Sequence, residues 1–100
     1  MSNELGKIGY VGLGNMGAPG ARHLHAAGAD VTVWNRSDGP AEQAVTQGMK
    51  RAPSLPELAR GVGDGIICLN LTTTDVVESV IDKLAEALSD DVLFIDFGTT

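Results

Sequence analysis

The sequence is poor in cysteine, in basic residues and in long apolar runs. Its one cysteine, Cys68, excludes an internal disulfide, and its apolar neighbours predict a small buried side chain in a strand rather than a reactive thiol. The 7 basic residues against 13 acidic ones give a net charge of −6, which excludes nucleic acids and anionic membrane surfaces as partners, because both require a basic face. No apolar run approaches the ~18–20 residues of a membrane span, and residues 1–7 lack the apolar stretch of a signal peptide, so we expect a cytoplasmic protein.

Apolar segments typical of strands alternate with segments of helical periodicity, and the length of 100 residues suits one domain. Strands are predicted over residues 8–11, 31–34, 49–52, 65–71 and 92–95. Helices are predicted over residues 18–27, 40–47, 55–59 and 74–88. Strands that are apolar on both faces and separated by amphipathic helices indicate the α/β class. We therefore predict a doubly wound parallel sheet of the Rossmann type, incomplete at about five strands, in an order near 3-2-1-4-5.

The segment Ser54-Leu55-Pro56-Glu57 has the pattern of a capping box. Ser54 is the expected N-cap of a short helix, and Glu57 follows three positions later. No metal site is predicted, because His23 and His25 lie two apart on a helix and therefore do not share a face.

A glycine cluster, GLGNMG, joins the first predicted strand to the first predicted helix and fits the pattern G-x-G-x-x-G. In this context Gly12 permits a tight turn, Gly14 allows the backbone to approach a pyrophosphate, and Gly17 allows close packing of helix and strand. The free amides at the helix start then favour the phosphates. The pyrophosphate-binding candidates are Gly12, Leu13, Gly14, Asn15, Met16 and Gly17. A purely architectural turn is the alternative.

The second predicted strand ends in Asn35-Arg36-Ser37. A carboxylate at this place would repel a 2′-phosphate, whereas Arg36 offers it a forked, charge-assisted pair of hydrogen bonds and Ser37 one more. The three residues therefore favour NADP(H), with NAD still possible, although the nearby Asp38 weakens the argument slightly. The alternative is a solvated arginine in a loop.

These segments resemble the β-hydroxyacid dehydrogenase family, which includes 3-hydroxyisobutyrate dehydrogenase, tartronate semialdehyde reductase, 6-phosphogluconate dehydrogenase and the related imine reductases. The matching segments are residues 8–19 (IGYVGLGNMGAP), 31–37 (VTVWNRS), 54–59 (SLPELA) and 93–99 (LFIDFGT). The resemblance covers essentially the whole chain. It is specific for the superfamily and leaves the substrate open.

The resemblance implies further cofactor contacts. The segment after the fourth strand contacts the cofactor in this family, which points to Leu71 and Thr72, and the threonine after the fifth strand, here Thr99, lies near the nicotinamide. Gly98 replaces a serine of the family pattern, and Pro40 stands where NADP-linked members often have a lysine. Binding of the 2′-phosphate would then depend on Arg36 and Ser37.

The resemblance also implies parts that these 100 residues lack. Family members carry a catalytic lysine in a later segment and then an all-helical domain that shapes the substrate pocket and the homodimer. Lys83 lies on the polar face of an amphipathic helix and has the wrong context for that role. We therefore expect no catalytic residue here, and no efficient hydride transfer by these residues alone.

The predicted function is that of an oxidoreductase that passes hydride between nicotinamide and a small β-hydroxy acid or semialdehyde. Two alternatives remain. The first is an imine reductase, and the second is a non-catalytic module that binds the dinucleotide.

Overall fold

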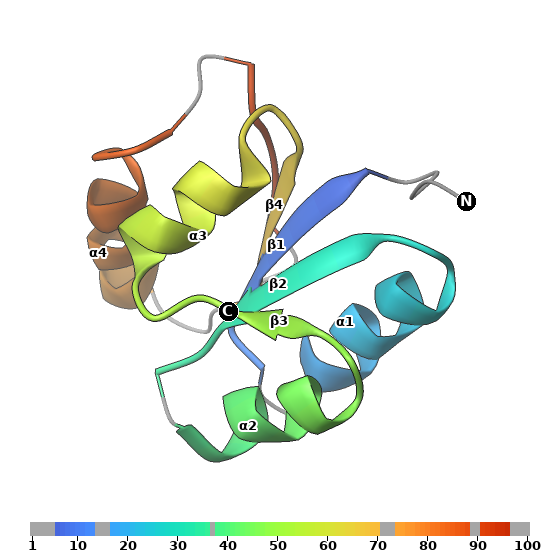
Figure 1. The fold of residues 1–100 in the computed structure, drawn as a ribbon. Coiled ribbons are helices and arrows are strands. Elements are labelled where there is room, and N and C mark those ends of the chain that lie inside the picture. The colour runs from blue at the N-terminus through green and yellow to red at the C-terminus, as the bar shows by residue number, and fades with distance from the viewer. Residues whose placement is uncertain (1–5, 14–16, 37, 71–73, 89–90, 97–100) are drawn as a thin grey trace.

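The computed structural model describes residues 6–13, 17–36, 38–70, 74–88 and 91–96, in which strands and helices alternate (Figure 1). The strands are β1 (Lys7–Val11), β2 (Asp30–Trp34), β3 (Lys50–Arg51), β4 (Ile66–Leu69) and β5 (Leu93–Asp96). The helices are α1 (Gly17–Ala26), α2 (Asp38–Thr46), α3 (Leu55–Val62) and α4 (Thr74–Leu84). The predicted alternation is confirmed.

The 5 strands form one parallel sheet in the order β3-β2-β1-β4-β5. Helices α1 and α2 cover one face of this sheet, and α3 and α4 cover the other (Figure 1). The doubly wound fold and its strand order are therefore confirmed. The order reverses beside β1, which pairs with β2 on one side and β4 on the other.

Each face of the sheet has its own apolar core, and β1 contributes to both because it is buried on both faces. The core under α1 and α2 contains Ile8, Tyr10, Leu13, Ala21, Ala29, Val31, Val33, Ala41, Ala44, Met49 and Cys68. The core under α3 and α4 contains Val11, Ala52, Leu55, Leu58, Ala59, Val62, Ile67, Leu69, Val80 and Leu84. Burial on both faces is the reason why β1 and β4 have no polar alternation, whereas β2 alternates between buried and half-buried residues.

Two helix ends differ from the periodicity. Helix α3 continues past Ala59 to Val62 and stops at Gly63, whose φ is 59° and whose amide returns to the Ala59 carbonyl. Helix α4 ends at Leu84, although the apolar spacing continues to Leu88. Residues 85–87 form turns instead, and half-buried Leu88 still packs on the core. Leu88 fits the apolar spacing because it is half-buried, although the residues before it form turns. Periodicity alone does not distinguish such a half-buried residue after a turn from a residue in a helix.

Gly20 lies in the middle of α1, where glycine costs up to about 1 kcal/mol relative to alanine. The tertiary structure supplies a reason for it. A Cβ at this position would lie 2.5 Å from the hydroxyl oxygen of Tyr10, which is only 3% exposed. Glycine therefore lets the helix approach the tyrosine of β1 closely.

We expect Gly20→Ala to lower the free energy of unfolding by about 1 kcal/mol, because overpacking against the rigid Tyr10 ring outweighs the gain in helix propensity. In a Tyr10→Phe background the 2.5 Å contact is gone and the ring carbon Cζ at 3.2 Å remains, so the same change is expected to cost less than in the unaltered chain. Urea denaturation of the two single variants and the double variant measures this coupling. An equal effect in both backgrounds would show that the hydroxyl contact is not the cause.

Candidate functional site

The carboxyl ends of three neighbouring strands lie at one level. Val11 of β1 is in register with Trp34 of β2 and with Leu69 of β4. Main-chain hydrogen bonds continue one residue beyond the strands, from the Gly12 amide to the Trp34 carbonyl (3.0 Å) and from the Asn70 amide to the Val11 carbonyl (2.8 Å). In doubly wound sheets, ligands bind at this edge where the strand order reverses.

The glycine segment leaves β1 at this edge through a turn that is tied to β2. Gly12 has a φ of 94°, a conformation that side chains disfavour. The side chain of Leu13 turns inward and is only 2% exposed, while its amide donates a 2.7 Å hydrogen bond to Oδ1 of Asn35. The amides of Gly12 and Leu13 are therefore satisfied by the protein itself, so these residues shape the turn.

The remaining predicted contacts are only partly described. Helix α1 begins at Gly17, and because it follows the turn after β1, its N-terminus faces the same edge. Backbone amides and the helix dipole at such an end favour an anion. The candidates Gly14, Asn15, Met16, Ser37, Leu71, Thr72 and Thr99 lie outside the described residues.

Arg36 follows Asn35 in the bend between β2 and α2, and its side chain is exposed. Asp38, the first residue of α2, forms an ion pair with Arg51 at the end of β3. The negative charge of Asp38 near Arg36 is thus partly balanced by a second guanidinium. The sequence analysis missed Arg51, because only the pairing of β2 with β3 brings it to this turn.

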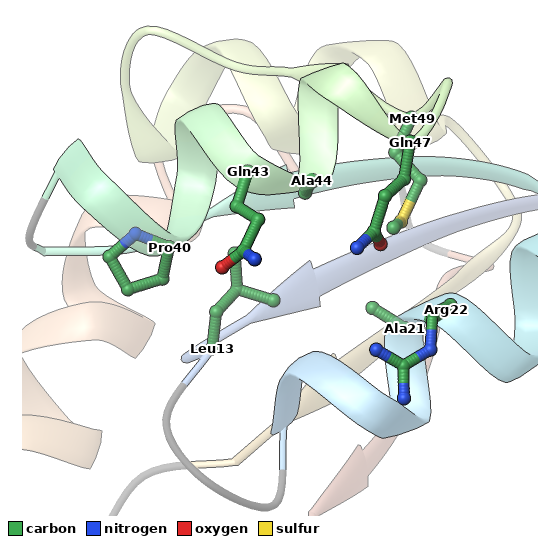
Figure 2. Close-up of a pocket in the computed structure, with 8 residues that line it drawn as sticks. All are labelled: Leu13, Ala21, Arg22, Pro40, Gln43, Ala44, Gln47 and Met49. Carbon is green, nitrogen blue, oxygen red and sulfur yellow. The ribbon is translucent and has the colours of Figure 1, made fainter.

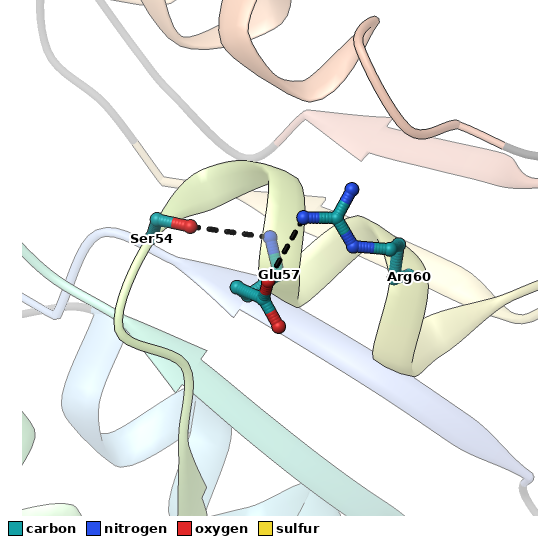
Figure 3. A network of polar contacts seen from close by, with 3 residues as sticks. All are labelled: Ser54, Glu57 and Arg60. Carbon is teal, nitrogen blue, oxygen red and sulfur yellow. Dashed lines mark hydrogen bonds and ion pairs between the residues drawn. The ribbon is translucent and has the colours of Figure 1, made fainter.

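The N-terminus of α3 keeps half of the predicted capping box (Figure 3). The Glu57 amide donates to Oγ of Ser54 at 3.3 Å, which confirms Ser54 as the N-cap. The carboxylate of Glu57 accepts a 2.8 Å hydrogen bond from Arg60, one turn along the helix. The cation at the i+3 position therefore attracts the side chain that a reciprocal box would direct to the N-cap amide.

Two hollows lie near this edge. Figure 2 shows the smaller one, of about 60 Å³, where Gln43 of α2 and Gln47, just after α2, face Ala21 and Arg22 of α1. Small-molecule sites usually measure ~300–1,000 Å³, so this hollow is too small for a dinucleotide. The larger one, of about 430 Å³, is lined by Trp34, Pro53, Ser54, Leu55, Pro56, Lys83 and Glu86.

Two side chains in the core of the described residues, Cys68 and Tyr10, have shifted pKa values. Burial raises the pKa of the Cys68 thiol, which keeps it protonated at neutral pH and unreactive, as predicted for a buried strand residue. Burial, and then the charge of Cys68, raise the pKa of the Tyr10 phenol.

Among the described ranges we find no group of three or more side chains suited to a metal ion. Within those ranges, no helix has the length and apolar character that crossing a bilayer requires.

Comparisons with known proteins agree with this geometry. Residues 7–100 match the family described as the NAD binding domain of 6-phosphogluconate dehydrogenase. The chain is 38% identical over 96 residues to the oxidoreductase YfjR of Bacillus subtilis, covering 93% of this chain and 33% of that protein. It is similar to the solved 3-hydroxyisobutyrate dehydrogenase of Mycobacterium tuberculosis, with 31% identity, a TM-score of 0.87, and coverage of 99% of this chain and 32% of that one.

A solved imine reductase from Bacillus cereus is also similar, with 27% identity, a TM-score of 0.82, and coverage of 95% of this chain and 32% of that one. The chain thus spans about a third of the length of the relatives it matches. The resemblance inferred from the sequence is confirmed. The glycine turn at the edge of a 3-2-1-4-5 sheet and the match over residues 7–100 give one conclusion: the chain belongs to the oxidoreductase family of the 6-phosphogluconate dehydrogenase NAD binding domain.

Proposed function

We propose that this chain binds NADP(H) across the carboxyl edge of its sheet, as the cofactor-binding part of an oxidoreductase. The observation that carries the proposal is the turn at Gly12 and Leu13, which is held against the end of β2 beside Arg36, with an amide rather than a carboxylate at residue 35. The amides that follow this turn, at the start of α1, would receive a pyrophosphate, and the Arg36 guanidinium would receive a 2′-phosphate. A bound nicotinamide would supply the hydride.

The proposed contacts divide along the cofactor. Gly12 and Leu13 shape the turn, because their amides already have partners, and the amides of residues 14–17 would receive the pyrophosphate. Arg36 and Ser37 would hold the 2′-phosphate. Leu71, Thr72 and Thr99 would lie nearer the nicotinamide, by the family resemblance.

The proposed reaction is hydride transfer between nicotinamide and a small β-hydroxy acid or semialdehyde. We propose that the catalytic lysine, the substrate pocket and the homodimer contacts belong to regions outside these 100 residues, so that the chain alone is not an efficient catalyst. The similarity to the solved imine reductase supports a second candidate, reduction of an imine. Oxidation of NADPH by the complete enzyme with a cyclic imine or with a semialdehyde separates the two.

Arg36→Ala is expected to weaken NADPH binding roughly 5- to 150-fold, the range for loss of a charged hydrogen-bonding partner, and to leave NADH binding nearly unchanged. Isothermal titration of both nucleotides measures the difference. Arg60→Ala is the matched control, because Arg60 is also an exposed arginine and lies in the last turn of α3, which leads away from the carboxyl edge. Equal losses for NADPH and NADH would refute the selectivity.

A further inference from the structure

Asn35 makes a contact that cofactor recognition alone does not explain. Its Oδ1 accepts the Leu13 amide at 2.7 Å, in a half-buried position and across 22 residues of sequence. The preceding residue, Trp34, accepts the Gly12 amide through its carbonyl at 3.0 Å. Two consecutive residues at the end of β2 thus hold two consecutive residues of the turn after β1.

This double contact fixes the point from which the glycine segment departs. The Leu13 side chain is anchored in the core, so the residue is held by its side chain on one side and by its amide on the other. Without the Asn35 oxygen, the Leu13 amide would lose its partner in a partly buried place, which costs more than the bond itself is worth. The turn would then populate other backbone conformations.

We propose that Asn35 is a positioning residue that sets the glycine turn for the pyrophosphate, an inference that rests on the proposed dinucleotide function. The requirement at this position is an oxygen acceptor, which both an amide and a carboxylate provide. Only the amide provides it without a negative charge beside Arg36. Asn35 therefore serves both phosphate contacts. Its oxygen holds the turn for the pyrophosphate, and its uncharged amide does not repel a 2′-phosphate beside Arg36.

The test compares the unaltered chain with Asn35→Ala, which removes the acceptor, and Asn35→Asp, which keeps it and adds a charge. Amide hydrogen exchange at Leu13, followed by NMR without nucleotide, reports the contact directly. We expect exchange to accelerate roughly 2- to 10-fold in Asn35→Ala, the range for one lost hydrogen bond, and to stay near the unaltered rate in Asn35→Asp.

Titration with NADH, which has no 2′-phosphate, reports positioning separately from charge. Asn35→Ala is expected to weaken NADH binding roughly 2- to 10-fold, and Asn35→Asp to preserve it while weakening NADPH binding. Unchanged Leu13 exchange in Asn35→Ala, or faster exchange with unchanged NADH affinity, would overturn the proposal. If Asn35→Ala does not fold, loss of Leu13 protection in Asn35→Asp would overturn it equally.

The same experiment separates this inference from the proposed function. If the unaltered chain binds neither nucleotide, the proposed function fails and the cofactor role of Asn35 fails with it. The exchange rates at Leu13 would still show whether Asn35 holds the turn. If both nucleotides bind and only the exchange prediction fails, the proposed function stands and the positioning role is lost.

Discussion

Replacement of Gly65 by alanine is expected to lower the free energy of unfolding by about 3 kcal/mol or more, an effect beyond ordinary overpacking. A Cβ at this position would lie 2.1 Å from the carbonyl oxygen of Lys7, at the start of β1. The neighbour is backbone, so no change of rotamer relieves the clash. The main chain of Gly65 is also fixed, because its amide donates to Val62 and its carbonyl accepts from Leu93.

Relief would require β1 and β4 to separate where Ile8 pairs with Ile66, in the centre of the sheet. Urea denaturation measures the loss, and Gly61→Ala is the matched control. Gly61 lies in α3, and a Cβ there would meet nothing within 4 Å. The control is expected to be neutral or to stabilise by up to about 1 kcal/mol. A Gly65→Ala variant as stable as the control would show that the two strands are not packed as described.

Gly9→Ala is expected to lower the free energy of unfolding by about 2 kcal/mol. Gly9 lies on the face of β1 that α3 covers, and a Cβ there would lie 2.6 Å from Cδ2 of Leu58 and 2.8 Å from Cγ2 of Val62. Both side chains are almost fully buried, at 0% and 2% exposure, so neither has space to withdraw. The glycine allows α3 to lie directly on the central strand.

The measurement is a double-mutant cycle with Leu58→Ala, again by urea denaturation. Removing the leucine side chain makes space, so Gly9→Ala is expected to cost at least about 1 kcal/mol less in that background. Gly39→Ala serves as the neutral control, since Gly39 is exposed in α2 and a Cβ there would meet nothing within 4 Å. Strictly additive effects would contradict the close contact between α3 and β1.

The local sequence pattern was sufficient to predict the helices and strands and the order of the strands in the sheet. Apolar runs predicted β1, β2, β4 and β5 to within a few residues, the expected strand order placed the short β3 near residues 49–52, and the capping residue Ser54 predicted the start of α3. Parallel order followed from general rules of connection, because right-handed crossovers leave few arrangements for alternating strands and helices. The edge that carries the glycine turn followed from the same rules.

The sequence pattern did not predict which hydrogen-bond or ion-pair partner a given side chain would take. Glu57 chose Arg60 over the reciprocal half of its capping box, and Asp38 chose Arg51, which lies 13 residues away. Gly20 had no visible reason until Tyr10 was placed beneath it. The Asp38–Arg51 pair and the Gly20–Tyr10 contact join segments that approach only after the sheet has formed. Arg60 lies in the same helix as Glu57, and there the pattern did not show which of two local partners the Glu57 carboxylate would take.

By itself, therefore, the sequence determined the doubly wound fold, the glycine turn at its ligand-binding edge and the family. These depend on periodicity, on glycine at fixed offsets and on residue type at a strand end, which are all properties of short segments. Only the tertiary structure decided that the Asn35 oxygen takes the Leu13 amide and that Gly9 and Gly65 are places of closest approach. The physical reason is that hydrogen bonds and van der Waals clashes change within a few tenths of an ångström, a precision that only the packed chain provides.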